Sequence, residues 1–435
     1  MRGEESMGAE GRYWNARTET MSRSEQEAHQ WRLLHAQLCY AYTHSPFYRE
    51  RWQARGVDPR AFQGPEDYFT QIPFLSKTDL IADQQDHPPF GTLLAVDPKA
   101  LVRLYISPGP LTWGFTATGY RKFAEVWAKG AYVCGVRAGD IVDVTAAYGW
   151  VPAGSLFDEA YRLIGAAVIP GNVGMSDFHV EVMKRVKVTV VQAFTTFLAT
   201  LGEVVKQKGI DPRRDLALRL GIIGGEIRSE AQKASLGDPF GGIAIREQYG
   251  TAEIGIIASE CEEGGGMHLN EDFLVEIIDP ETGEHVPPGA SGEIVTSDVV
   301  REAMPIIRYR TGDLTAGLNL EPCPCGRTTP RLQRILGRSS DIPRIKGMFI
   351  IPRTIQTVLA RYPELGRFQI VVDRPRHQDE LTIRIEYTAP VDVANLTPKL
   401  VEELRNAIRV TPQVELLPAG TIPAEAGLVD DRRKV

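Results

Sequence analysis

Long apolar runs are missing from this sequence. No stretch of its 435 residues approaches the ~18–20 consecutive apolar residues that span a bilayer, so we expect neither a transmembrane helix nor a membrane partner. The segment from Met1 to Trp14 is polar and acidic, and it lacks the apolar stretch of a signal peptide. These two absences predict a cytoplasmic protein.

An excess of basic charge is also missing. Lysine and arginine number 49 against 56 aspartates and glutamates, a formal net charge of −7, so nucleic acid is not an expected partner. Hydrophobic residues make up 43% and charged residues 24%, the averages of soluble globular proteins, which argues against extensive disorder. A chain of this length is too long for one ordinary core and predicts two or three domains.

Cysteine is scarce. The chain has five, and an odd number without a signal peptide argues against a disulfide framework. Cys39 and Cys134 stand alone in apolar, helix-like stretches, where we expect small buried side chains. The other three lie in polar surroundings rich in glycine and proline, where a buried thiol is not expected.

Those three cysteines and one histidine form a candidate metal site. Cys261 and His268 have Cys-x₆-His spacing, and a Cys-Pro-Cys-Gly sequence follows further along the chain. Three thiolates and one imidazole are a common tetrahedral zinc shell, and four protein ligands leave no position open for a substrate. We therefore predict a structural zinc ion held by Cys261, His268, Cys323 and Cys325. The remaining histidines are isolated, and ordinary surface or core roles suffice for them.

The spacing of apolar residues predicts an α/β protein. Ser22 and Glu25 have capping-box spacing, and the helix that begins there is expected to end near Ser45-Pro46. From about Asp140 short apolar runs alternate with amphipathic segments, an order that predicts parallel βαβ units. The predicted strands are 141–144, 188–192 and 220–223, and the predicted helices are 180–186 and 197–208.

The pattern changes after Tyr249. Residues 274–278 and 292–296 have strand character, and a turn at 279–283 lies between them. This arrangement predicts a β section rich in hairpins.

A further change begins near Gly337 and predicts a small α+β domain behind a linker. The expected organisation is a large N-terminal domain over 1–336, with βαβ sheets, the β section and the zinc loop. A small, hinge-linked and mobile α+β domain is expected over 337–435. Its predicted strands are 368–372 and 381–387, and its predicted helix is 398–409.

Several short segments resemble the signatures of adenylate-forming ligases, and they occur in that family's order. Two further segments, 45–49 and 72–80, resemble the phenylacetate–CoA ligase branch rather than the longer fatty acyl members. The chain is therefore identified as a member of that branch, and the resemblance implies the adenylate-forming ligase fold. The shared signatures are Gly224-Gly225-Glu226, Tyr249-Gly250-Thr251-Ala252-Glu253, Arg308-Tyr309-Arg310-Thr311-Gly312-Asp313 and Gly337-Arg338-Ser339-Ser340-Asp341.

The resemblance also implies roles for these residues. In the family a carboxylate attacks the α-phosphate of ATP, and the CoA thiol then displaces AMP. Asp313 would accept both ribose hydroxyls, Glu253 would bind the bridging Mg²⁺, and Tyr249 would stack beside the adenine. Without the family, Asp313 is a solvated turn aspartate and Glu253 a carboxylate near a helix start. The implied nucleotide-pocket residues are Glu226, Tyr249, Gly250, Thr251, Glu253, Asp313 and Arg338.

Two elements of the family pattern are altered here. The phosphate loop of the type Ser-Ser-Gly-Thr-Thr-Gly-Lys-Pro corresponds to residues 107–114, which align only if Thr-Thr-Gly-Lys is missing. Pro108 and Pro110 also remove two N–H donors from what remains. The family's C-terminal Glu-Gly-Lys has no counterpart after Gly420, where no lysine occurs before Lys434. Both changes predict that ATP-dependent adenylation is lost or strongly impaired.

Aromatic residues match the segments that line the acid pocket in the family. Aromatic lining suits an aryl or other flat acyl group, although aromatics at such spacing are equally common in an ordinary core. The candidate substrate residues are Tyr148, Trp150, Phe194 and Phe197. No catalytic residue is assigned.

Three functions stay open at this point. The favoured one is an enzyme for an aromatic or small organic acyl group that arrives already activated, as a thioester or an acyl-adenylate, for transfer, cyclisation or hydrolysis. The second is an active AMP-forming aryl acid–CoA ligase with a rebuilt phosphate loop, and the third is a non-catalytic partner in a biosynthetic complex. The expected partners are a small acyl substrate and CoA or a phosphopantetheine carrier protein; AMP or ATP, Mg²⁺ and a homodimer remain open.

Overall fold

The computed structural model describes residues 11–107, 109–224, 229–339, 342–345, 348–374, 379–389 and 391–434. The chain divides into two compact units. The first consists of residues 1–311 and 315–335, and the second of residues 312–314 and 336–435. Within the described ranges, no helix combines the length and the apolar character needed to cross a bilayer.

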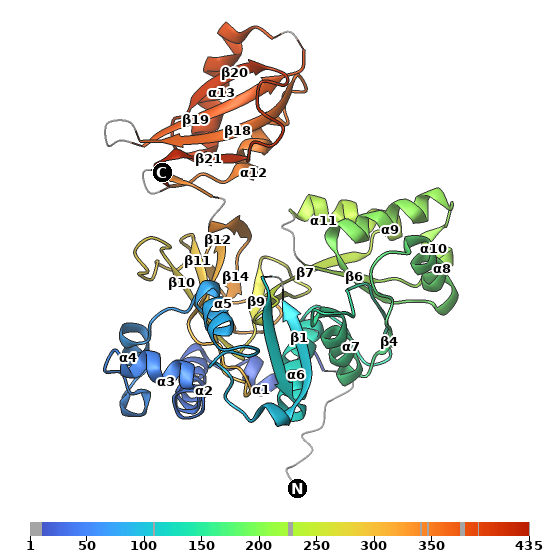
Figure 1. Ribbon diagram of the computed structural model, residues 1–435. Coiled ribbons are helices and arrows are strands. Elements are labelled where there is room, and N and C mark those ends of the chain that lie inside the picture. Colours follow the sequence, from blue (N-terminus) through green and yellow to red (C-terminus); the bar gives the residue numbers. More distant parts are fainter. Residues whose placement is uncertain are drawn as a thin grey trace. The chain divides into compact units, whose positions relative to one another are not determined.

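The first unit begins with a set of helices (Figure 1). The predicted capping box is present, because the Ser22 side chain accepts from the Glu25 amide and the Glu25 carboxylate accepts from the Ser22 amide. The helix ends at His44, and a second helix starts at Pro46, where proline is well tolerated. These helices are α1 (Ala16–Glu19), α2 (Arg23–His44), α3 (Pro46–Gln53), α4 (Pro65–Gln71) and α5 (Lys77–Asp86).

A nine-stranded sheet forms the centre of the described part of this unit, in the order β13-β14-β9-β8-β7-β6-β5-β3-β4. The run from β7 to β4 is parallel, which confirms the predicted βαβ units. The run from β7 to β13 is antiparallel. The strands are β3 (Ile141–Val144), β4 (Ala167–Ile169), β5 (Val190–Phe194), β6 (Leu220–Gly224), β7 (Ala244–Thr251), β8 (Gly255–Glu260), β9 (Met267–Leu269), β13 (Leu318–Asn319) and β14 (Arg331–Leu332).

Helices cover both faces of the parallel strands. On β5, Val190 belongs to the core that includes Leu156 of α7, whereas its neighbour Val191 belongs to the core that includes Val180 of α8 and Leu198 of α9. A strand buried on both faces explains why its sequence is a continuous apolar run. The helices of this region are α6 (Ala117–Val133), α7 (Ala153–Ile164), α8 (Ser176–Val186), α9 (Thr195–Gln207), α10 (Pro212–Asp215) and α11 (Glu230–Gly237).

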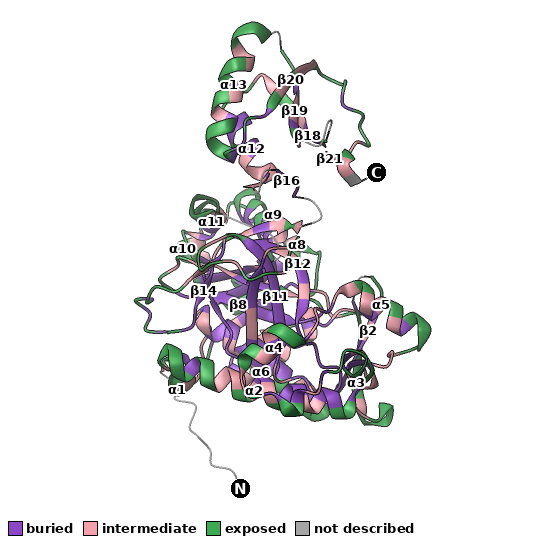
Figure 2. Cartoon of the chain, turned by 90° about the vertical axis from the view of Figure 1, so that its left-hand side faces the viewer, coloured by how far each residue is buried: buried purple, intermediate pink, exposed green. Residues whose placement is uncertain are grey.

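The predicted β section is a second sheet, in the order β10-β11-β12-β15. Its first two strands pair antiparallel, as the predicted hairpin requires, and β8 and β11 are buried along their full length (Figure 2). A separate hairpin pairs β1 with β2. These strands are β1 (Leu101–Ser107), β2 (Leu111–Thr116), β10 (Phe273–Ile278), β11 (Gly292–Asp298), β12 (Tyr309–Thr315) and β15 (Ile335–Arg338).

The second unit has a core of its own, in which Ile355, Ile383 and Leu404 are fully buried. Its sheet has the order β20-β19-β18-β21. The elements are β16 (Arg344–Ile345), β17 (Met348–Phe349), α12 (Pro352–Leu359), β18 (Leu365–Asp373), β19 (Glu380–Tyr387), α13 (Val393–Ile408), β20 (Gln413–Pro418) and β21 (Val429–Asp431).

Short 3₁₀ turns lie in both units. Those of the first unit are Pro59–Ala61, Pro98–Ala100 and Asp238–Phe240, and that of the second unit is Arg432–Lys434.

The turn between β7 and β8 depends on Gly255. Its φ is +95°, and a Cβ at this position would lie 2.7 Å from Phe123 Cζ and 2.8 Å from Trp127 Nε1. Gly242 has a similar φ of +82° but nothing within 4 Å of its Cβ position. We predict that both alanine variants lose about 1–2 kcal/mol to the left-handed backbone. Gly255→Ala should lose more, because α6 must also move. Equal free energies of unfolding for the two variants in urea would contradict this prediction and show that Phe123 and Trp127 move aside at no cost.

Candidate functional site

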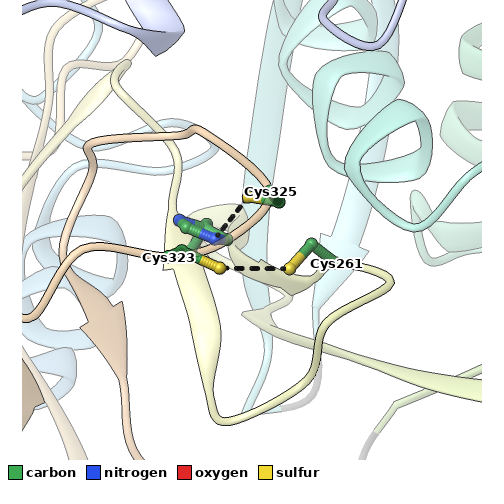
Figure 3. A group of neighbouring side chains, drawn as sticks. Cys261, Cys323 and Cys325 are labelled. Atoms are coloured by element: carbon green, nitrogen blue, oxygen red, sulfur yellow. Dashed lines mark hydrogen bonds between the residues drawn. The ribbon is translucent and has the colours of Figure 1, made fainter.

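The four predicted metal ligands lie together in the structure. The ligand atoms of Cys261, His268, Cys323 and Cys325 all lie within 4.8 Å of one another, and all four residues are buried. The Sγ atoms of Cys261 and Cys323 are 3.7 Å apart (Figure 3), far beyond the ~2.05 Å of a disulfide bond. With Zn–S bonds of ~2.3 Å, a tetrahedral site places two sulfurs roughly 3.8 Å apart. The residues therefore fit a zinc ion.

The strand order explains how these ligands meet. Cys261 follows β8 and His268 lies on β9, while Cys323 and Cys325 lie between β13 and β14 at the same end of the sheet. The Nδ1 atom of His268 lies 3.1 Å from both the carbonyl oxygen and the hydroxyl of Thr329. Its Nε2 faces Cys325 Sγ at 3.3 Å. An Nδ1–H bond to a carbonyl leaves Nε2 unprotonated and oriented as a ligand, as second-shell partners of metal-bound histidines do.

The nucleotide-pocket candidates that the structure describes in the first unit lie on one hairpin. Tyr249, Gly250 and Thr251 end β7, and Glu253 lies in the turn before β8. The Thr251 hydroxyl accepts a hydrogen bond from the Ile254 amide and shapes that turn. Glu226 lies outside the described residues.

Glu253 is a buried carboxylate with close partners from two other elements. Its Oε1 atom lies 2.8 Å from Lys77 Nζ, at the start of α5. Ser107, the last residue of β1, donates its hydroxyl to the same oxygen at 3.4 Å and accepts from Trp113 Nε1 at 3.2 Å. Lys77 is a neighbour of Glu253 that the sequence did not single out, because it lies about 175 positions away, in a segment that indicated the branch of the family but no role for its lysine.

The other two candidates lie in the second unit. Asp313 on β12 and Arg338 on β15 form an ion pair with 3.1 Å between Oδ1 and Nε. Asp313 is the less exposed partner, at 13% of its side-chain surface against 57% for Arg338. The Asp313 carboxylate is thus paired with a cation that is accessible to solvent.

The candidate substrate aromatics do not form one enclosed group. Tyr148 donates its hydroxyl to Asp158 at 3.3 Å, and burial together with this carboxylate raises the pKa of Tyr148. Trp150 is 79% exposed and Phe194 49% exposed, so neither side chain is enclosed by the described residues. Phe197 packs its ring edge-on against His179, with 5.5 Å between the ring centroids.

His179 has a buried partner that the sequence did not single out. Ordinary surface or core roles were expected for the histidines outside the metal cluster, and His179 has a core position, with its Nδ1 atom 2.7 Å from Asp143 Oδ2 and both residues buried. Asp143 is on β3 and His179 on α8, so the pair joins a strand to the helix that covers it. Spacing along the chain gives no signal for such a pair, since only the crossover brings the two residues together.

Comparison with known proteins agrees with the motifs. The AMP-binding enzyme family matches residues 132–299, and the AMP-binding enzyme C-terminal domain matches residues 347–433. Phenylacetate-coenzyme A ligase of Thermus thermophilus is 34% identical over 436 residues, covering 94% of this chain and 96% of the relative. The enzyme of the same name from Aromatoleum evansii is 30% identical, covering 92% and 91%. The chain belongs to the phenylacetate–CoA ligase family.

Solved structures support the fold of this family member along its full length. A 2-hydroxyisobutyryl-CoA ligase in an open conformation, in complex with 2-HIB-AMP and CoA, superposes with a TM-score of 0.87 at 27% identity. The match covers 99% of this chain and 97% of that one. The amide bond synthetase McbA from Marinactinospora thermotolerans, at 18% identity and a TM-score of 0.52, shares the fold over 74% of the chain. The protein is accordingly an acyl-CoA ligase-like enzyme of the adenylate-forming class.

For the metal cluster, we propose one tightly bound Zn²⁺ per chain, contributing on the order of 10 kcal/mol to folding. Elemental analysis of protein purified without chelator should find about one zinc per chain. Cys323→Ser should lose the metal and unfold at lower temperature, whereas Cys39→Ser, outside the cluster, should keep both metal and stability. Protein free of metal as isolated would refute the assignment.

The His179–Asp143 pair predicts a pH dependence of stability. Burial alone would lower the pKa of His179, but the hydrogen bond and charge of Asp143 outweigh it and raise this pKa. A raised histidine pKa stabilises the fold fully below the ordinary value of ~6.5, and this contribution is lost as pH rises through the raised pKa. The difference in melting temperature between wild type and His179→Gln should therefore be larger at pH ~5.5 than at pH ~8.5. His44→Gln, at an exposed histidine, is the control; a pH-independent difference for His179→Gln would contradict the ion pair.

Proposed function

We propose that this enzyme handles an aromatic or small organic acyl group that arrives already activated, as a thioester or an acyl-adenylate. In this proposal, ATP-dependent adenylation of a free acid is lost or strongly impaired. The observation that carries it is the β1–β2 hairpin, which occupies the position of the family's phosphate loop in sequence.

This hairpin offers few groups to a triphosphate. Ser107 pairs with Leu111 across the strands, so only three residues of sequence connect them. Loops that bind phosphates do so with backbone N–H groups, and two of these three residues are prolines. Such a connection can direct at most the Gly109 N–H toward an anion.

The threonines of the hairpin do not replace the missing donors. The Thr112 amide donates to Gln84 Oε1, and its carbonyl accepts from Gln84 Nε2. The Thr116 hydroxyl accepts from the Gly119 amide and donates to Glu302. A loop rebuilt around these groups would first have to break bonds that shape α6 and β2.

The C-terminal loop supports the same proposal. Arg367 donates hydrogen bonds to the carbonyl oxygens of four residues there, and Gln369 donates to a fifth. The loop is held by side chains of β18, and no lysine occurs between Lys399 and Lys434. The accepting carbonyls belong to Ile422, Pro423, Ala424, Ala426 and Gly427.

The expected loss of rate is large. Removing one preorganised donor to a transition state costs ~2.7–4 kcal/mol. Two independent losses amount to roughly 5–8 kcal/mol, or about 10⁴–10⁶ in rate. A chain with both alterations would therefore turn over activated acyl groups far faster than it would activate an acid.

An active AMP-forming aryl acid–CoA ligase is the second candidate. The observation that favours it is the set of full-length relatives named phenylacetate-coenzyme A ligase. The two candidates differ in one measurable step, the acid-dependent exchange of pyrophosphate into ATP.

We predict that acid-dependent ATP–pyrophosphate exchange stays at background for a panel of aryl acids. The Thermus thermophilus relative, assayed in parallel, is the positive control. AMP, CoA or an acyl thioester should raise the melting temperature, and ATP–Mg²⁺ should add nothing over AMP. A ligand at 100 times its dissociation constant stabilises by about 2.7 kcal/mol, which a thermal shift detects.

Two results would change this conclusion. Robust exchange with any acid would refute the loss of adenylation and favour the active ligase. No thermal shift with any of these ligands would favour a non-catalytic partner of a biosynthetic complex.

A further inference from the structure

Glu253, the residue that the family pattern assigns to magnesium, already has a cation beside it. Its side chain is 8% exposed, and the ammonium of Lys77 lies 2.8 Å from Oε1. The Ser107 hydroxyl donates to the same oxygen. The Oε1 atom of this carboxylate thus has a cation and a hydrogen-bond donor beside it before any metal ion arrives.

The backbone position of Lys77 is fixed by interactions of the neighbouring residues. The residue is the first of α5, whose start is fixed by a capping box between Ser76 and Asp79. Asp79 also pairs with Arg51 at 3.2 Å, which ties α5 to α3. The backbone that carries the lysine is therefore preorganised.

The end of the Lys77 side chain lies against Gly109, in the connection between β1 and β2. A Cβ on Gly109 would lie 3.0 Å from Lys77 Cε and 3.2 Å from Lys77 Nζ, so the end of the lysine rests directly on this glycine. Gly109 also has a φ of +104°, which L side chains rarely adopt. A residue with a side chain at position 109 would therefore displace the end of Lys77.

Magnesium does not fit this arrangement. Mg²⁺ requires six oxygen ligands at 2.0–2.1 Å in near-octahedral geometry. Here the Glu253 carboxylate already pairs with the Lys77 ammonium at Oε1. A divalent ion at Oε1 would have to share that oxygen with the ammonium, against the repulsion of two cations.

We propose that the ammonium of Lys77 replaces the metal ion at Glu253, so that the enzyme binds the phosphate of a nucleoside monophosphate or an acyl-adenylate without a divalent cation. This inference rests on the proposed function, in which an activated acyl group or AMP is the ligand. With 38% of its side chain exposed, Lys77 remains accessible to a ligand in solution, whereas Glu253 anchors it from the protein side. A lysine acts toward a phosphate as a point charge and needs no particular orientation.

The test is calorimetric titration of the full-length protein with AMP, in EDTA and in excess Mg²⁺. The wild type should bind with the same dissociation constant in both buffers. Lys77→Met should weaken binding in EDTA by about tenfold or more, the effect of losing one charge-assisted hydrogen bond. Lys77→Arg should stay close to the wild type. In Lys77→Met, Mg²⁺ should restore part of the affinity, because the Glu253 carboxylate is then open to a metal.

Lys122→Met, at an exposed lysine on α6, controls for the general loss of positive charge. Melting curves for all variants separate a folding defect from a binding defect. A wild type that needs Mg²⁺ to bind AMP overturns the proposal, and so does a Lys77→Met variant that melts earlier but binds AMP normally. Absence of AMP binding by the wild type also overturns the proposal. The thermal shift with an acyl thioester would then still test the proposed function. Conversely, robust pyrophosphate exchange would refute the proposed function and leave metal-independent, Lys77-dependent AMP binding standing.

Discussion

The N-terminal helices are joined to the β section at the buried ion pair between Arg308 and Glu276, through the Tyr68 hydroxyl and the Ile72 carbonyl. The guanidinium lies 3.0 Å from the Glu276 carboxylate, which also accepts the Tyr68 hydroxyl at 2.9 Å. The Arg308 carbonyl accepts the Leu75 amide at 2.9 Å, two residues before Lys77. Removing one partner of a buried ion pair typically costs ~3–5 kcal/mol, because the remaining charge is left buried without compensation.

The start of α5 is placed by backbone hydrogen bonds beside this pair. The Leu75 amide donates to the Arg308 carbonyl, just before β12, and the Leu75 carbonyl accepts from the Arg310 amide on β12, so the first turn of α5 has little freedom. Lys77 then reaches Gly109 and the carboxylate of Glu253 at the same time. The Cys/His cluster acts at the other end of the antiparallel strands, where it joins the loop after β8 to the loop between β13 and β14. One end of this region is thus held by a charge pair and the other by a candidate metal site.

Local patterns predicted much of the fold. The capping box of Ser22 and Glu25, the parallel strands around 141–144 and the hairpin 274–296 follow from interactions between residues close in sequence, or from apolar runs that need burial on both faces. The sequence was sufficient to predict that the four candidate metal ligands lie together, because thiols in polar loops have few roles other than metal binding. Aromatic spacing was a weaker signal, since it does not separate an enclosed ring from the exposed Trp150 and Phe194.

The sequence by itself determined the family, the order of the elements and the residues available for chemistry, because motifs and periodicity are properties of neighbouring residues. Only the tertiary structure decided which charges meet. The pairing of His179 with Asp143 requires a βαβ crossover, and that of Lys77 with Glu253 requires a helix, a β-hairpin and a β-turn to converge. Electrostatic interactions act through space and leave no periodic trace along the chain, so the state of the Glu253 carboxylate was not readable from its motif.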